Sequence, residues 1–161
     1  MSTNPEPSNP EPANPGPANP EPARPGYGVT FDEIELGDEL PVEHPDVSLP
    51  RIKLWCDAAD QHFPRFLDHE AARAEGLPGA LVPGIMNQGF LLALLHRWAP
   101  TATVRKIDTV FRGQMIIETE LTVSGAVTDT DDEARTVEVD LTVVGADGRT
   151  GVIGTAVLAF A

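Results

Sequence analysis

The sequence predicts an α+β domain in which one long, mostly buried helix lies on a strongly curved antiparallel sheet of about five strands. Residues 84–98 are apolar on nearly every face of a helix, so this helix needs neighbours on most sides. After it come four segments rich in β-branched residues and separated by turns, at 104–111, 118–127, 136–144 and 151–160. Polar and apolar residues alternate strictly along 136–143, which predicts a strand with one buried and one wet face.

The N-terminus differs in composition from the rest of the 161-residue chain. Nine of the 16 prolines fall within the first 25 residues, where a five-residue unit beginning Asn-Pro repeats four times between residues 4 and 23. Closely spaced prolines fix φ and remove backbone donors, which favours extended polyproline II. We therefore divide the chain into a disordered proline-rich tail, residues 1–26, and a single domain, residues 27–161. Docking of the tail to a proline-binding partner is the alternative.

Charge and cysteine content restrict the function. The chain has 25 acidic and 11 basic residues and a formal net charge of −14, whereas binding to a phosphate backbone needs clustered Lys and Arg. No apolar run approaches the roughly 20 residues that span a bilayer, and the first residues lack the basic and apolar regions typical of a signal peptide. The single cysteine, Cys56, excludes an internal disulfide. We expect a cytoplasmic protein that binds neither nucleic acid nor membrane.

The first part of the domain is expected to begin with irregular structure. Residues 29–45 contain spaced apolar positions broken by Gly37-Asp38, which predicts a short segment, a turn and a strand. Ser48 is a candidate N-cap for a helix with near-helical apolar spacing, and Pro50 is tolerated in its first turn.

Two further elements are expected before the long helix. Residues 60–67 predict a loop that carries aromatic and histidine side chains. Asp68 then predicts the cap of a short helix at 69–75, which Gly76 ends.

The segment from Lys53 to Asp68 resembles the MaoC-like branch of the hotdog fold, which comprises R-specific enoyl-CoA hydratases and 3-hydroxyacyl-thioester dehydratases. The pattern in that family is approximately Y-A-x-A-S-G-D-x-N-P-I-H-x-D-x-x-x-A-x-x-x-G-x-P-G-x-I-A-H-G-M. An ungapped overlay from Trp55 to Gly84 matches Ala58, Pro64, Asp68, Ala72, Gly76, Pro78, Gly79 and Gly84. With 31–40 and 110–127 also similar, the resemblance covers nearly all of residues 29–160 and implies a hotdog fold.

The resemblance also implies a substrate class. Proteins of this family act on acyl thioesters carried on coenzyme A or on the phosphopantetheine of an acyl carrier protein, and no other cofactor is expected. Gly84, at the start of the long helix, matches the position where free backbone N–H groups and the helix dipole bind the thioester carbonyl oxygen.

The motif residues that handle protons in the family are replaced in this chain. The family's aspartate and histidine, five residues apart, correspond to Gln61 and Phe66, and the histidine before the helix corresponds to Pro83. Neither replacement can transfer a proton, and each positioned acid or base contributes about 10²–10⁴-fold. We therefore expect little ordinary hydratase activity but a retained thioester pocket, with Gln61, Phe66, Pro83, Gly84 and Asn87 as candidate substrate-binding positions. Asn87 is alternatively a packing residue that needs a polar partner if buried.

Local substitutes for the missing pair exist. Asp57 and His62 have the same five-residue separation, as do Asp60 and Arg65 with arginine in place of histidine, but either pair requires a shifted loop. Without a shift, His62, Asp60 and Arg65 are candidate catalytic residues for a different reaction. The plain alternative is that the two aspartates end a helix on its solvent side.

No metal site is expected, because the four histidines lack the spacing of metal ligands. A glycine-rich phosphate loop is also missing.

Two functions remain open. The first is an enzyme of the dehydratase/hydratase family whose diverged site catalyses a related addition, elimination or cyclisation. The second is a non-catalytic hotdog subunit that completes the pocket of a catalytic MaoC-like partner. A hotdog thioesterase usually has a carboxylate on the central helix, and residues 84–98 contain none.

A homodimer or a heterodimer with another hotdog subunit is expected in either case, because a lone hotdog leaves a sheet edge open. Recognition of an anionic carrier would depend on local basic residues: Arg51, Lys53, Arg65, Arg105 and Lys106.

Overall fold

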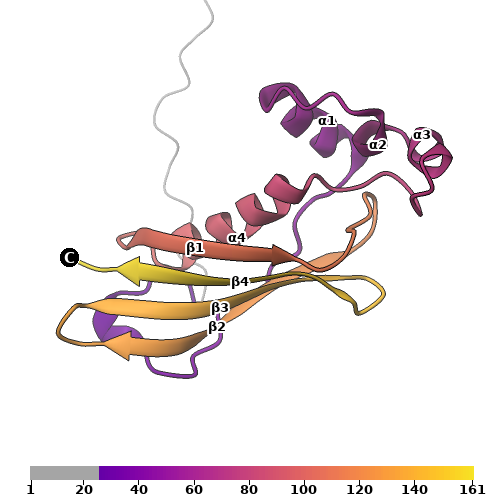
Figure 1. Cartoon of the computed structure of the whole chain (residues 1–161). Helices are drawn as coiled ribbons and strands as arrows, with labels where there is room; N and C mark the ends of the chain where they lie inside the picture. Colours follow the sequence, from indigo (N-terminus) through magenta and orange to yellow (C-terminus); the bar gives the residue numbers. More distant parts are fainter. Residues whose placement is uncertain (1–25) are drawn as a thin grey trace, which may run out of the picture.

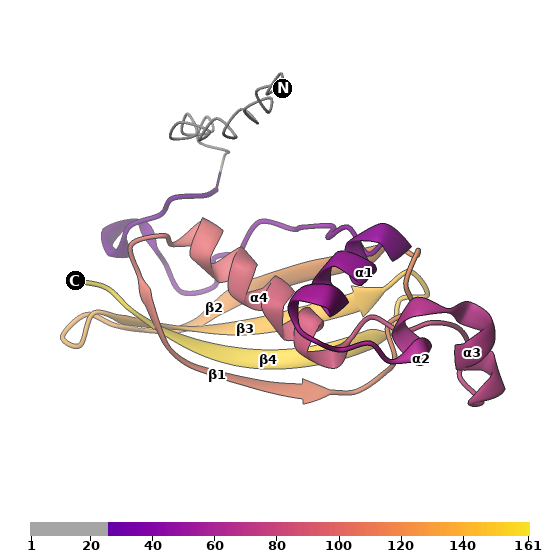
Figure 2. The ribbon, with the colours of Figure 1, turned by 90° about the horizontal axis from the view of Figure 1, so that it is seen from above.

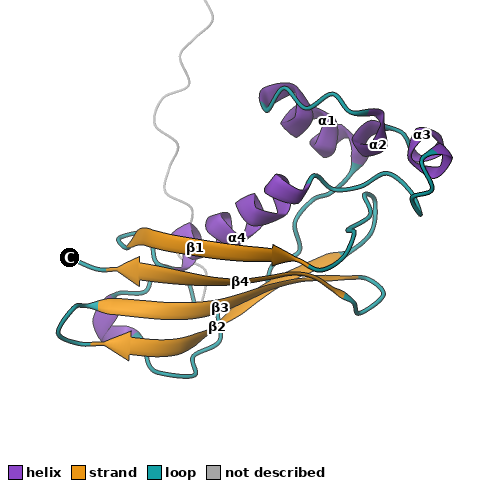
Figure 3. Ribbon diagram, viewed as in Figure 1, coloured by secondary structure: helices purple, strands orange, loops and turns teal. Residues whose placement is uncertain are grey.

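The structure is a computed structural model that describes residues 26–161. The predicted proline-rich tail lies outside the described residues, apart from Gly26. The elements in chain order are η1 (Phe31–Glu33), α1 (Leu49–Ala58), α2 (Pro64–Leu67), α3 (His69–Ala74), α4 (Gly84–Trp98), β1 (Thr103–Phe111), β2 (Leu121–Asp131), β3 (Thr136–Gly145) and β4 (Thr150–Ala159). The helices thus precede all four strands (Figure 3).

The four strands form one antiparallel sheet in the order β1-β4-β3-β2. Helix α4 runs along one face of this sheet. Helix α1 lies beside the N-terminal half of α4, and α2 and α3 lie beyond that end (Figures 1 and 2). The predicted α+β architecture, with a long helix on an antiparallel sheet, is confirmed.

The sheet has four strands rather than about five. The segment predicted to supply the first strand runs beside the outer edge of β2 but pairs only through isolated bridges at Glu39 and Glu43. Pro41 between them has no N–H to donate, which prevents a continuous ladder. Residues 37–43 therefore cover the edge of β2 without forming a strand.

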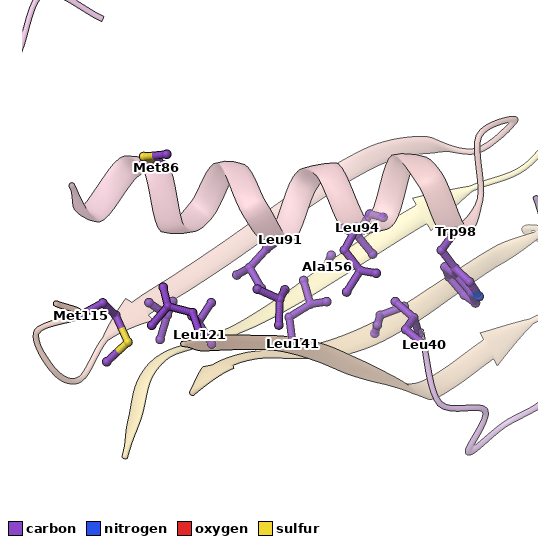
Figure 4. Packing of buried hydrophobic residues seen from close by; sticks show 14 of the residues in the cluster. Leu40, Met86, Leu91, Leu94, Trp98, Met115, Leu121, Leu141 and Ala156 are labelled. Carbon is purple, nitrogen blue, oxygen red and sulfur yellow. The ribbon is translucent and has the colours of Figure 1, made fainter. Parts of the chain in front are cut away.

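Helix α4 has the bounds that the apolar pattern predicted. Leu91, Leu94 and Trp98 are buried and point toward the sheet, where they meet residues such as Leu141 and Ala156 (Figure 4). Met86 points away from the sheet. Because both the sheet side and part of the opposite side of α4 are covered, its sequence is apolar around most of its circumference.

The described chain begins at the C-terminal end of α4. The N–H groups of Gly28 and Val29 donate to the carbonyl oxygen of Trp98, at 2.8 and 2.9 Å. These bonds satisfy one of the carbonyl groups that a helix leaves unpaired at its C-terminus, and they fix where residues 1–25 join the domain.

The region before α4 differs from the expected loop in one respect. Residues 64–67 form a single helical turn, α2, with Pro64 in its first position, where a missing N–H does no harm. Ser48 occupies the N-cap position of α1 but its hydroxyl makes no capping bond. Asp68 caps α3 as predicted and accepts hydrogen bonds from the N–H groups of Glu70 and Ala71, at 2.7 and 2.9 Å.

None of the helices in the described part of the chain is long and apolar enough to cross a membrane.

Candidate functional site

Backbone hydrogen bonds to two neighbouring segments hold the N-terminus of α4 in place. The N–H of Val82 donates to the carbonyl oxygen of Met115 at 2.8 Å, and the N–H of Leu81 donates to that of Arg65 at 2.9 Å. The residues that lead into α4 are therefore tied both to the chain that follows β1 and to α2.

Two backbone donors at this helix end have no partner among the described residues. The carbonyl oxygen of Pro83 accepts from the N–H groups of Met86 and Asn87, at 3.0 and 3.2 Å, but the N–H groups of Gly84 and Ile85 donate to no described group. Gly84 is exposed. Free N–H groups at the positive end of a helix dipole bind anions and polarised carbonyl oxygens.

The ring of Phe111, at the end of β1, borders the same helix end. It lies 3.5 Å from the position that a Cβ atom on Gly84 would occupy. About half of the Phe111 side chain is exposed. The two donors thus have an apolar, aromatic neighbour with its other face open.

Asn87 lies one turn into α4 and is the only buried polar residue in the described part of the chain. Its Nδ2 donates to the carbonyl oxygen of Pro83 at 3.3 Å, whereas its Oδ1 has no hydrogen-bond partner. A buried acceptor without a partner is rare and needs a physical explanation. Asn87 is therefore buried with one acceptor unused, and its role in binding substrate stays a prediction.

The residues at the altered motif positions contribute packing. The N–H of Gln61 donates to the carbonyl oxygen of Cys56 at 2.9 Å and closes the end of α1. Phe66 makes an edge-to-face contact with Phe63, with ring centroids 5.8 Å apart, and packs on the hydrophobic core. Pro83 is buried at the N-cap of α4.

His62 is brought together with both candidate carboxylates. Its Nδ1 is 3.5 Å from Oδ1 of Asp57 and its Nε2 is 3.6 Å from Oδ1 of Asp60. All three side chains are open to water, with exposed fractions of 53%, 70% and 98% for His62, Asp57 and Asp60. Their catalytic role stays a prediction.

Arg65 is engaged elsewhere. Its Nη2 lies 2.9 Å from Oε2 of Glu75, just after α3. This ion pair joins α2 to the end of α3. It neutralises the guanidinium charge of Arg65, which was predicted to take part in proton transfer. The pair Asp60 and Arg65 therefore makes no described contact, and the catalytic role of Arg65 also stays a prediction.

One histidine near the site was missed by the sequence analysis. Nδ1 of His69 accepts a hydrogen bond from the N–H of Ala80 at 3.1 Å, and its Nε2 lies 3.1 Å from Oε2 of Glu118. A Cβ on Gly79 would lie 2.9 Å from Nδ1 of His69, so only glycine leaves room for the ring. Glu118 is 49 residues from His69, and no local sequence signal connects them.

A groove of about 360 Å³ lies between α1 and α4. It is lined by Arg51, Leu54 and Trp55 from α1 and by Met86, Gly89 and Phe90 from α4. Most of its surface is apolar. On α4 it reaches the first two turns, just after the two free donors.

The only cysteine of the chain is buried in α1. Burial, followed by the neighbouring carboxylate of Asp57, raises the pKa of the Cys56 thiol. Cys56 is thus a core residue with little thiolate at neutral pH. Within residues 26–161, no three His, Cys, Asp or Glu side chains gather in an arrangement that would hold a metal ion.

Several solved structures share this fold, although no model of a known protein family and no curated protein matches the sequence. The (R)-hydratase from A. caviae involved in PHA biosynthesis has a TM-score of 0.75 and 15% identity, over 80% of this chain and 98% of its own. A MaoC-like dehydratase has a TM-score of 0.76 and 23% identity, over 85% of this chain and 43% of its own. The ChsH1–ChsH2 complex from Mycobacterium tuberculosis gives a TM-score of 0.71 and 20% identity, over 79% of this chain and 98% of the matched subunit.

These likenesses identify the fold. The chain has the hotdog fold found in MaoC-like dehydratases and R-hydratases, as the sequence resemblance implied.

Proposed function

We propose that this chain is an acyl-thioester-binding hotdog subunit of the hydratase or dehydratase type. The observation that carries the proposal is the pair of unpartnered N–H groups, on Gly84 and Ile85, at the positive end of α4. A thioester carbonyl gains negative charge on its oxygen when the neighbouring carbon is attacked or deprotonated, and two preorganised N–H donors stabilise that charge. The substrate would be an enoyl or 3-hydroxyacyl thioester of coenzyme A or of an acyl carrier protein.

A partner subunit would supply the groups that move protons. In this chain Gln61 and Phe66 cannot titrate, and His62 lies on an open surface with its two carboxylates. Acid–base catalysis needs a positioned group in a site that limits access of water. One of the similar structures, ChsH1–ChsH2, is itself a complex of two subunits, which supports a division of binding and catalysis between two chains.

The outer edge of β1 is the surface at which a partner subunit would join. Among the described residues β1 pairs only with β4, so its outer edge is open, whereas residues 37–43 cover the outer edge of β2. An open edge offers unpaired N–H and C=O groups to another chain. A homodimer or heterodimer would therefore form a continuous sheet through β1, next to Phe111 and the N-terminus of α4.

A second candidate function rests on His62. Because the structure places its imidazole between Asp57 and Asp60, the chain would itself catalyse a diverged addition, elimination or cyclisation with His62 as the base.

Binding and turnover separate these functions. Isothermal titration with crotonyl-CoA and 3-hydroxybutyryl-CoA should show binding to the purified chain, and turnover should appear only after co-expression with a hotdog partner that has an intact D-x-x-x-x-H motif. Turnover by the isolated chain that disappears in His62→Asn would favour the second candidate. No binding of either thioester would contradict both.

A matched pair of variants tests the binding donors directly. Gly84→Pro removes one N–H at the first helical position, where proline fits and where Pro83 already has the extended ψ of 135° that a following proline requires. Gly84→Ala keeps the N–H and adds a similar Cβ. Since one hydrogen bond contributes about 0.5–1.5 kcal/mol, Gly84→Pro should weaken thioester binding by about 3- to 10-fold relative to Gly84→Ala.

A further inference from the structure

The groove between α1 and α4 has features that the proposed thioester site does not use. Aliphatic and aromatic side chains line it: Leu54 is 60% exposed, and Trp55 and Phe90 are half-buried. A large exposed apolar side chain beside two aromatic rings is typical of a surface that contacts another chain segment.

One cation without an ion pair borders this groove. Arg51 lines the groove and forms no ion pair with a described residue. Most other basic side chains of the domain do form ion pairs: Arg65, Arg73, Arg97, Lys106, Arg135 and Arg149. Because residues 27–161 carry 22 acidic and ten basic residues, a cation without an ion pair at the groove favours an acidic segment there.

Gly89 keeps the groove open. It lies inside the 15-residue helix α4, and a Cβ on it would meet nothing within 4 Å. Glycine inside a helix is less favourable than alanine by about 0.8–1.0 kcal/mol. At this position its absent side chain leaves the helix backbone accessible as the floor of the groove.

The chemistry of the groove fits an extended proline-rich segment that carries carboxylates. Polyproline II chains dock on aromatic-lined grooves because they lose little conformational entropy on binding. This chain contains such a segment in its own first 25 residues: four proline repeats with Glu6, Glu11 and Glu21.

The point of attachment makes this segment the nearest ligand. The described chain begins beside Trp98, and Phe90 and Met86 are 8 and 12 residues earlier on α4. At 1.5 Å per helical residue these lie about 12 and 18 Å from Trp98. A polyproline II chain rises about 3.1 Å per residue, so about six residues before Gly26 cover the distance. The repeat unit at 19–23, which contains Glu21, would then reach the groove.

We propose that residues 19–23 of this chain dock in the groove between α1 and α4, with their prolines against Trp55 and Phe90 and with Glu21 facing Arg51. Covalent attachment gives the segment a high effective concentration, on the order of millimolar, so weak contacts suffice. The segment would lie beside the first half of α4, next to the proposed thioester site.

Paramagnetic relaxation in the full-length chain tests this proposal. A nitroxide attached to Ala18→Cys labels one site, because the native Cys56 is buried. The amide signals of residues 51–58 and of Gly89 and Phe90 should be broadened. Arg51→Glu should remove most of this broadening, and adding Glu21→Lys should restore it.

The matched control is Arg105→Glu, which reverses another exposed cation that forms no ion pair in the described residues. This control should leave the broadening unchanged. Broadening confined to residues next to the attachment point, or equal in Arg51→Glu and Arg105→Glu, would overturn the proposal. Broadening that passes from a labelled molecule to an isotope-labelled one in a mixed sample would also overturn it, since the occupant would then belong to a second copy. None of these signals depends on thioester binding.

Discussion

His69 shows how one side chain can position the candidate site from outside it. Its ring accepts the N–H of Ala80 on one side and meets Glu118 on the other, and so joins α3 to the segment that enters α4. Glu118 has a left-handed φ of 58°, a conformation that is uncommon for a residue with a side chain. The interactions of His69 therefore hold a strained backbone position next to the site.

We expect His69→Ala to weaken both the fold and the site. Loss of the acceptor for the Ala80 N–H should lower the free energy of unfolding by about 1–3 kcal/mol, because that donor is left without a partner. Thioester affinity should also fall, since the N-terminus of α4 is less well positioned. Urea unfolding and isothermal titration measure the two effects. His96→Ala, an exposed position on the same helix as the site, should change neither.

At the scale of the elements, α3 depends on one capping carboxylate. The N–H groups of Ala71 and then Glu70 lower the pKa of the Asp68 carboxyl below its ordinary value of 3.8. A carboxyl whose pKa is lower in the folded state stabilises the fold above its unfolded pKa, and this stabilisation is lost as the pH falls through the folded pKa.

Asp68→Asn should therefore reduce the acid sensitivity of the domain. Above about pH 5 the wild type should melt at a higher temperature than the variant, because the ionised cap is fully effective there. Below about pH 4 the difference should shrink as Asp68 becomes protonated. Melting curves followed by circular dichroism across this range provide the measurement. A difference that is the same at both ends would show that the charge of Asp68 does not matter.

Substituting alanine for glycine should change the free energy of unfolding in opposite directions in α4 and in β2. Gly89→Ala should stabilise the fold by up to about 1 kcal/mol, because α4 gains a better helix former and the new Cβ meets nothing. Gly125→Ala should destabilise it by about 1–3 kcal/mol, because the new Cβ would lie 2.7 Å from the backbone oxygen of Asp140 in the neighbouring strand. Denaturant titrations would decide. Stabilisation by both variants, or destabilisation by both, would contradict the packing around Gly89 and Gly125.

At the scale of the whole molecule, the open edge of β1 and the apolar residues near it predict association. Val110 and Phe111 at the end of β1, and Ile85 at the start of α4, are each about half exposed. Large apolar side chains next to an unpaired strand edge favour burial against another chain. At the opposite side of the sheet, residues 37–43 already cover the edge of β2.

Native mass spectrometry should find a dimer of this chain or a heterodimer with a hotdog partner. Val110→Glu combined with Phe111→Glu should convert it to a monomer that keeps its circular dichroism spectrum, because two charges at the edge oppose pairing. The matched control is Leu36→Glu, another exposed apolar residue outside β1. A dimer that survives the double variant and dissociates with Leu36→Glu would place the interface elsewhere.

The sequence alone determined the elements whose signals are local. The bounds of α4 follow from a continuous apolar pattern that begins after Pro83, and the cap of α3 follows from Asp68 and its spacing to the helix. Alternation of side chains predicted β3, because a strand with one wet face has a period of two. The resemblance to MaoC-like proteins gave the hotdog fold, which the similar structures support.

The tertiary structure decided the contacts between distant segments. The first strand became an irregular edge because Pro41 cannot donate a hydrogen bond, and a single proline is a weak signal in a short segment. The pairing of His69 with Glu118 and the groove between α1 and α4 exist only once the chain has packed. Local propensity specifies the period and ends of an element, whereas packing chooses which side chains meet, and the candidate site depends on that choice.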